Sequence, residues 1–187
     1  MLTLAVGLGV LAQVIRDDPT FVAPGRNKLA WVQSPNFGPR KNMLDVDTIV
    51  LHHTAADTLG GTVRWFQDPK SEVSAHFVVG KDGSIVQQVS TFQRAWHAGV
   101  SIDKFGRPNV NNFSIGIEMV NVGDGKDAYT EAQIEAVHHL IAELKRRFPT
   151  IKQITSHKFI AQPPGRKPDP LGFPWSRLED LGIELVP

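Results

Sequence analysis

The stretch D-T-I-V-L-H-H-T, residues 47–54, decides the fold. Its centre is a continuous run of aliphatic, mostly β-branched residues, which is typical of a buried strand. A second run, F-S-I-G-I-E-M-V at residues 113–120, predicts another central strand. Both runs carry a group that titrates, His52 in the first and Glu118 in the second, which a purely structural strand has no need of.

The clearest helix is predicted over residues 130–148. Thr130 followed by Gln133 resembles a capping box, and Pro149 ends the pattern. Apolar or half-apolar side chains recur inside it at helical spacing. They are Ile134, Val137, His138, Ile141 and Leu144.

Shorter elements fill the rest of the chain. Residues 58–67 predict a helix that Thr58 or Asp57 caps, with three large side chains on one side. Those side chains are Val63, Trp65 and Phe66. Residues 75–89 predict a hairpin around the turn Lys81–Ser84. A short strand is expected at 151–156, before His157.

Strands alternate with helices, but one hairpin interrupts the alternation. This pattern predicts the α/β class, with a central mixed β-sheet flanked by helices. A chain of 187 residues is long enough for one well-buried domain, and its hydrophobic content of 41% is ordinary for a globular protein. The net charge of +1 gives no electrostatic case for binding nucleic acid.

The first 45 residues differ from the rest, so we divide the chain into residues 1–45 and a main domain at 46–187. The apolar run at 2–15 is too short to span a bilayer. It is either the core of a signal peptide, although no Lys or Arg precedes it, or a short helix docked on the domain. The proline-rich residues 17–45 predict an extended arm.

The chain has no cysteine, so a metal site would use His, Asp or Glu. His52 and His157 each follow an apolar run, and Asp169 lies in a loop. Two imidazoles and a carboxylate suit a catalytic zinc that keeps one position open for water. No local spacing rule joins the three residues. His52 as a hydrogen-bonded strand end and Asp169 as a turn residue are the alternatives.

Five motifs in order raise the specificity of this interpretation. They are L-H-H-T at 51–54, S-A-H-F at 74–77, R-A-W-H-A-G at 94–99, N-F-S-I-G-I-E at 112–118, and S-H at 156–157 with R-K-P-D-P at 166–170. Together they resemble the type 2 N-acetylmuramoyl-L-alanine amidases over roughly residues 45 to 175. That family includes muropeptide-recycling amidases, autolysins and phage endolysins, and the peptidoglycan recognition proteins are its relatives.

The resemblance implies an amidase type 2 fold, similar to that of the peptidoglycan recognition proteins, with residues 46–187 as the zinc amidase catalytic domain. It implies Zn2+ as the cofactor, bound by His52, His157 and Asp169. Neighbouring strand residues point to opposite faces, so only one of His52 and His53 can reach the ion. The resemblance favours His52, which leaves His53 buried or beside the ligands.

Glu118 is the expected general base. A carboxylate in an apolar strand is costly unless it is paired or functional, and burial near a cation can tune it for proton transfer. The recycling-type members of the family are taken to use this glutamate. Other members place a tyrosine where this chain has Ala75. A salt bridge at the sheet edge is the structural alternative.

Four further residues are candidates for a role in substrate turnover. The family motif assigns Lys167 the stabilisation of the oxyanion, and a solvated lysine is the alternative. His97 and Trp96 are expected to line the substrate groove, or else to be plain core. Arg166 is a candidate partner for a carboxylate of the substrate's peptide, because a guanidinium suits bidentate recognition.

The predicted function is zinc-dependent hydrolysis of the amide between N-acetylmuramic acid and L-alanine, in peptidoglycan or muropeptides. The alternatives are a zinc-free peptidoglycan-binding module of the same fold and a hydrolase of another amide. We expect a monomer without stable membrane insertion. A bacteriolytic enzyme such as an endolysin, acting in the cell envelope or after release, is favoured over a cytoplasmic recycling enzyme.

Overall fold

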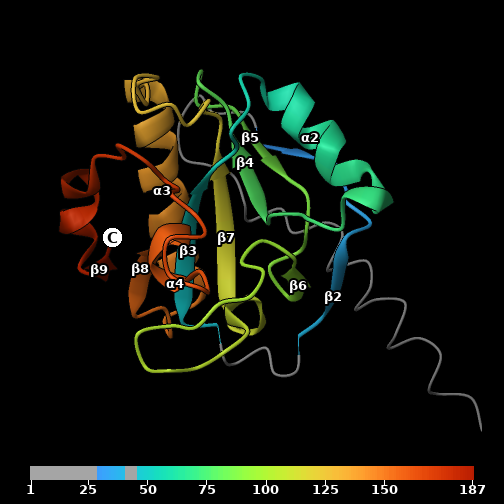
Figure 1. Ribbon diagram of the computed structural model, residues 1–187. Helices are drawn as coiled ribbons and strands as arrows, with labels where there is room; N and C mark the ends of the chain where they lie inside the picture. The colour runs from blue at the N-terminus through green and yellow to red at the C-terminus, as the bar shows by residue number, and fades with distance from the viewer. Residues whose placement is uncertain (1–28, 41–45) are drawn as a thin grey trace, which may run out of the picture.

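The computed structural model describes residues 29–40 and 46–187, which form a twisted sheet with helices on both faces (Figure 1). The expected N-terminal helix, or signal core, at residues 2–15 lies outside the described residues, as does much of the expected arm. No helix in the described ranges is both long and apolar enough to cross a bilayer.

Within the described ranges, strands and helices follow one another along the chain. The strands are β1 (Leu29–Trp31), β2 (Phe37–Pro39), β3 (Thr48–His53), β4 (Phe77–Val79), β5 (Ile85–Gln87), β6 (Gln93–Ala95), β7 (Ser114–Met119), β8 (Gln153–Ser156) and β9 (Glu184–Val186). The α-helices are α2 (Leu59–Gln67), α3 (Glu131–Arg147) and α4 (His157–Ile160). The 3-10 helices are η2 (Pro69–Ser71), η3 (Val110–Asn112) and η4 (Trp175–Leu181).

The main sheet has the strand order β1-β5-β4-β7-β3-β8-β9. The predicted hairpin β4–β5 is antiparallel, and the other neighbouring pairs are parallel. The expected mixed sheet flanked by helices is therefore confirmed. Part of the predicted arm belongs to it, because β1 pairs with β5 at the sheet edge. β2 pairs with β6 in a separate two-stranded ribbon.

Alternation along the two central strands divides polar from apolar side chains. Ile49 and Leu51 of β3 pack in the large core cluster that α3 covers. Val50, between them, faces the opposite side and packs against α4. His52 follows on that same face because strand side chains have a period of two. The apolar run thus delivers one imidazole to the face that α3 does not occupy.

Helix α3 forms as the sequence predicts, with one difference at its start. The Thr130 hydroxyl accepts the Gln133 N–H at 3.2 Å, which confirms the N-cap. The Gln133 side chain does not reach back, as a capping box requires. It donates instead to the carbonyls of Val79 and Val120 at 3.0 and 3.1 Å. The Gln133 amide is buried between α3 and the sheet, where these carbonyls accept its hydrogen bonds, so it does not turn back to the exposed start of the helix.

Helix α2 is confirmed with Thr58 as its N-cap, but the orientation expected for one side chain is wrong. Val63 and Phe66 are buried, whereas Trp65 is 57% exposed. Trp65 is two positions from Val63, and a helix turns such positions well apart. The indole consequently faces solvent rather than the core.

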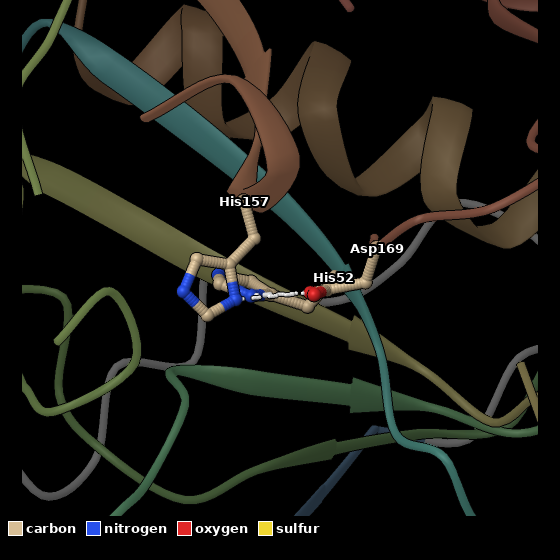
Figure 2. Close-up of side chains that lie close together, drawn as sticks. All are labelled: His52, His157 and Asp169. Carbon is tan, nitrogen blue, oxygen red and sulfur yellow. Dashed lines mark hydrogen bonds and ion pairs between the residues drawn. The ribbon is translucent and has the colours of Figure 1, made fainter. Parts of the chain in front are cut away.

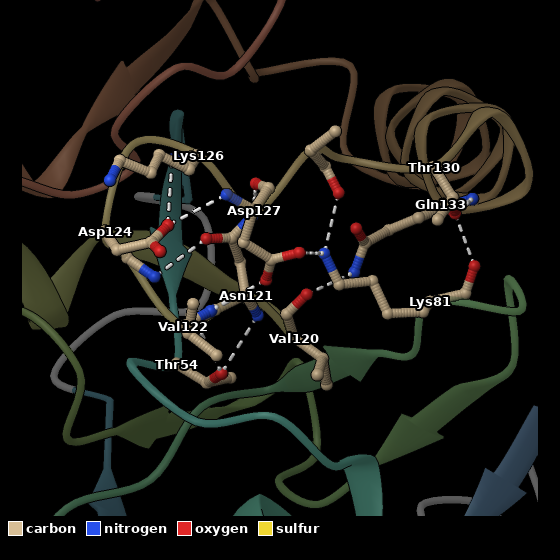
Figure 3. A network of polar contacts seen from close by, with 12 residues as sticks. Thr54, Lys81, Val120, Asn121, Val122, Asp124, Lys126, Asp127, Thr130 and Gln133 are labelled. Atoms are coloured by element: carbon tan, nitrogen blue, oxygen red, sulfur yellow. Dashed lines mark hydrogen bonds and ion pairs between the residues drawn. The ribbon is translucent and has the colours of Figure 1, made fainter.

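The loop after β7 is held by a network of polar contacts (Figure 3). Asp127 accepts hydrogen bonds from Lys81 Nζ at 2.7 Å and from the Val122 N–H at 2.9 Å. Gly123 in this loop has φ +75°, and a Cβ there would lie 2.5 Å from His53 Nε2. The network therefore holds a loop that only glycine lets approach His53 so closely.

Candidate metal centre

Three side chains from distant parts of the chain converge on one point (Figure 2). His52 comes from β3, His157 begins α4 directly after β8, and Asp169 lies in the loop beyond α4. Asp169 Oδ2 lies 3.2 Å from His52 Nδ1 and 3.0 Å from His157 Nδ1. The structure thus brings together the three residues that the sequence predicted as metal ligands.

The donor set fits zinc in both chemistry and spacing. One ligand atom from each residue lies within 4.8 Å of the other two, and all three residues are buried. Ligand atoms on a tetrahedral zinc, each about 2.0–2.2 Å from the ion, lie roughly 3.3 Å apart. The 3.2 and 3.0 Å separations are close to that value. His52, His157 and Asp169 would hold the ion.

Electrostatics favour the ligand forms of His52 and Asp169. Burial, and then the neighbouring His157, lower the pKa of His52 to about 4, so its ring is neutral at pH 7. Burial alone would raise the pKa of Asp169. The two neighbouring imidazoles of His157 and His52, whose Nδ1 atoms contact Asp169 Oδ2, outweigh burial and hold that pKa below its ordinary value. A neutral imidazole and an ionised carboxylate are the forms that bind a metal.

His53 occupies the other side of the strand end, as alternation requires. Its Nδ1 accepts the Leu171 N–H at 3.2 Å, next to the loop that carries Asp169. Burial lowers the pKa of His53 from its ordinary value. The ring therefore supports the Asp169 loop and is not part of the three-residue cluster.

Glu118 stands beside His52 because β3 and β7 are parallel and pair these two residues in register. β7 is the middle strand of the sheet, and Glu118 forms no ion pair within the described ranges. The alternative of a salt bridge at the sheet edge is therefore wrong. Its Oε2 is buried without a hydrogen-bond partner in the described part of the chain. Burial, and then the charge of Asp169, raise the pKa of Glu118 to about 8.

A pocket of about 500 Å³ opens over the cluster. Glu118, Lys167 and Asp169 all line it, as do Trp96 and His97. Other lining residues come from α2 and the segments around it, and no sequence motif predicted them. They include Thr62, Trp65 and Val73. The exposed indole of Trp65 was the available signal, since a large apolar side chain left in water often marks a binding surface.

His97 and Arg166 form hydrogen-bond contacts within the protein that the sequence did not predict. His97 is 8% exposed, and its two ring nitrogens lie 3.0 Å from His52 Nε2 and 3.1 Å from Ser114 Oγ. Burial lowers the pKa of His97 well below its ordinary value. The structure does not bring Arg166 to the pocket lining. Its guanidinium donates to the carbonyls of Gln162 and Val100 at 2.7 and 2.9 Å. Direct contact of either residue with substrate stays a prediction.

Comparison with known families gives one assignment for most of the chain. The profile described as N-acetylmuramoyl-L-alanine amidase matches residues 42–172. Among curated proteins, the 1,6-anhydro-N-acetylmuramyl-L-alanine amidase AmpD of Haemophilus influenzae is 35% identical over 166 residues. The match covers 78% of this chain and 88% of that protein.

Solved structures agree with the sequence matches. The crystal structure of an AmpD derivative superposes with a TM-score of 0.67 at 33% identity, covering 82% of this chain and 93% of that one. The N-acetylmuramyl-L-alanine amidase AmiD from E. coli superposes with a TM-score of 0.66 at 31% identity, covering 82% of this chain and 62% of AmiD. That structure is a complex with the substrate anhydro-N-acetylmuramic acid-L-Ala-D-gamma-Glu-L-Lys.

Proposed function

This chain belongs to the N-acetylmuramoyl-L-alanine amidase family and hydrolyses the amide between N-acetylmuramic acid and L-alanine, and we propose that it does so with one zinc ion held by His52, His157 and Asp169. The convergence of three buried ligand atoms beneath the pocket is the observation that carries the proposal. Zinc with three protein ligands acts as a Lewis acid and lowers the pKa of water toward neutrality.

Glu118 moves the proton in this mechanism. Its Oε2 is buried without a partner beside the cluster, and burial raises its pKa to about 8. A cation held beside it would favour the ionised form of this carboxylate, which then accepts a proton from the water that attacks the lactyl carbonyl carbon. When the carbon–nitrogen bond breaks, Glu118 returns that proton to the amine of L-alanine. The products are a carboxylic acid on the sugar and a free peptide.

Lys167 supplies a positive charge on the pocket wall, two residues before Asp169. Negative charge develops on the carbonyl oxygen as the water adds, and a preorganised cation stabilises it. Burial of the cluster strengthens this interaction, because a charge pair is screened less when water is excluded. Lys167 thereby lowers the barrier without exchanging a proton.

We further propose soluble 1,6-anhydro-muropeptides as the preferred substrates. Support comes from the AmpD relative, which the match covers over 88% of its length, and from the anhydro-muramyl ligand of the AmiD complex. Bacteriolytic action on the polymeric wall, location in the envelope or after release, and a monomeric state remain separate predictions.

The test compares a soluble anhydro-muropeptide with whole sacculi as substrates, each with and without a zinc chelator. We expect faster release of the peptide from the soluble substrate, loss of activity with the chelator, and recovery on adding zinc. Mass analysis of the products identifies the bond that breaks. Equal or faster release from sacculi would instead favour a lysin.

The zinc-free binding module predicts a different result in the same preparations. A pure receptor would contain no stoichiometric zinc and would release no peptide from either substrate. The complete ligand set and the buried Glu118 Oε2, which has no hydrogen-bond partner in the described residues, argue against it, because neither is needed for binding alone. Metal analysis of the purified protein separates the two.

A further inference from the structure

His97 lies beneath the ligand cluster, on the sheet face that carries His52 and Glu118. Its ring packs flat on β7 at Gly116, where an added Cβ would come within 2.5 Å of the His97 ring. The backbone on either side is held by Asn111, whose Oδ1 accepts the N–H groups of His97 and Ala98 at 3.1 and 2.8 Å. The glycine and the asparagine together place this ring in one position.

The direction of each hydrogen bond follows from Ser114. Its hydroxyl lies 2.7 Å from the carbonyl of Val110, which can only accept, so the hydroxyl proton points there. Ser114 Oγ then accepts from His97 Nε2–H at 3.1 Å. A neutral imidazole has a single N–H, so His97 Nδ1 carries a lone pair and accepts from His52 Nε2–H at 3.0 Å. The proton of His52 thus lies on the nitrogen away from the cluster.

Ala98, the residue after His97, fixes the position of the proton on His157 in the same way. His157 Nε2 lies 3.2 Å from the carbonyl oxygen of Ala98, which requires an N–H at that nitrogen. The Nδ1 atoms of both histidines therefore present lone pairs toward Asp169 Oδ2, at 3.2 and 3.0 Å. Three acceptors that face one another in a buried site repel, and a cation between them removes the repulsion.

We propose that His97, backed by Ser114, is a positioning residue that selects the Nδ1-metal tautomer of His52, and that the Ala98 carbonyl does so for His157. One segment thereby prepares both imidazoles for the ion before it binds. This inference rests on the metal centre of the proposed function. Partners of this kind orient metal-binding histidines, and their loss weakens metal affinity about 10- to 100-fold.

The first test measures zinc dissociation constants of purified variants by competition with a chelating dye. His97→Phe keeps a ring but offers no acceptor, and we expect zinc affinity to fall about 10- to 100-fold. His97→Asn places an amide oxygen near the position of Nδ1, and we expect its affinity to stay within about threefold of the parent, since it keeps the acceptor.

The matched control is His76→Phe. His76 is another fully buried histidine near His97, but its nitrogens bond to the Gly116 N–H at 3.0 Å and the Gln93 carbonyl at 3.0 Å. Its loss should lower thermal stability while leaving zinc affinity within about twofold, because no metal ligand depends on it. Equal zinc affinity of His97→Phe and His76→Phe would overturn the proposal.

The second test needs no substitution. Long-range 1H–15N correlation spectra of the zinc-loaded protein report which nitrogen of each imidazole carries the proton. We expect Nε2–H at His97, with Nδ1 as the acceptor. A proton on Nδ1 of His97, or on both nitrogens, would contradict the inference even though zinc is bound. Failure of the parent protein to bind zinc would instead contradict the proposed function.

Discussion

Two His–Asp pairs in this molecule have almost the same length and very different surroundings. His157 Nδ1 and Asp169 Oδ2 are 3.0 Å apart, with side chains 6% and 7% exposed. His138 Nε2 and Asp180 Oδ1, between α3 and η4, are 2.9 Å apart, with side chains 25% and 72% exposed. Distance alone therefore does not distinguish the candidate metal ligands from a surface contact.

The difference lies in what else converges on each pair. Asp169 Oδ2 also faces His52 Nδ1, whereas both oxygens of Asp180 face the same nitrogen of His138. In the described ranges, only the buried pair belongs to a group of three that could hold a metal. At the surface, water solvates the charges and the pair contributes little. Burial and a third potential ligand turn the same contact into a candidate metal centre.

The largest effect is expected when each pair loses its carboxylate. Asp169→Ala removes one of three ligands, and we expect zinc affinity to fall more than about 100-fold, beyond the loss seen for supporting residues. Turnover should be lost with it. Asp180→Ala should leave zinc affinity unchanged within about twofold, since its charge is exposed. Chelator competition measures the zinc affinity of both variants. Comparable losses of affinity in the two would mean that the buried pair is no more a metal site than the exposed pair.

The second prediction separates metal binding from chemistry in the buried region. Glu118→Gln keeps the shape of the side chain but cannot accept a proton at the substituted position. We expect stoichiometric zinc and a loss in kcat of about 10²- to 10⁴-fold, the range for general acid–base catalysis. Activity assays on an anhydro-muropeptide, paired with metal analysis, check it. Near-parental kcat would exclude Glu118 from the mechanism.

The third prediction compares two lysines near the cluster. Lys167 lines the pocket, whereas Lys158, next to His157, is exposed. Lys167→Ala should lower kcat by about 100-fold with a smaller change in KM, because the charge acts on the transition state. Lys158→Ala should change neither parameter more than about twofold, since exposed charges are screened. Equal effects would mean that Lys167 is an ordinary surface lysine.

The smallest expected effect is on the pH dependence of the free energy of unfolding of the metal-free protein. The folded state holds the pKa of Glu118 at about 8, above its ordinary 4.5. Between these values the unfolded chain has released a proton that the folded chain keeps, so stability falls as pH rises. We expect a slope on the order of 1 kcal/mol per pH unit, which Glu118→Gln should reduce. Urea unfolding at several pH values measures it, and equal slopes in the parent and the variant would contradict the assignment.

Some of the fold could be predicted because local pattern and tertiary structure agree. β3, β7 and α3 carry long apolar runs or a clear helical period, and each formed where the sequence indicated. β1, β2, β6 and β9 have three residues each and were not predicted. Such short strands exist through pairing with a neighbour, and the sequence does not encode that pairing locally.

The same limit applies to the candidate site. The ligand residues could be named from their types and motifs, and Glu118 from the cost of burying a carboxylate. The groups that orient the ligand histidines could not be predicted, because they are the Ser114 hydroxyl, which contacts His97, and the Ala98 carbonyl, which contacts His157. Every residue has a backbone carbonyl, so the residue type does not indicate which carbonyl orients a ligand. A serine in a strand is common and likewise gives no signal. Trp65 was misplaced because it was grouped with Val63, although residues two positions apart on a helix do not share a face.

The measurement closest to the central claim is an anomalous difference map, collected at the zinc absorption edge, from crystals of the zinc-loaded protein. We predict one strong peak about 2.0–2.2 Å from His52 Nδ1, His157 Nδ1 and an Asp169 oxygen, the normal zinc distances. A map without that peak, or with its zinc at His138 and Asp180 instead, would contradict the account.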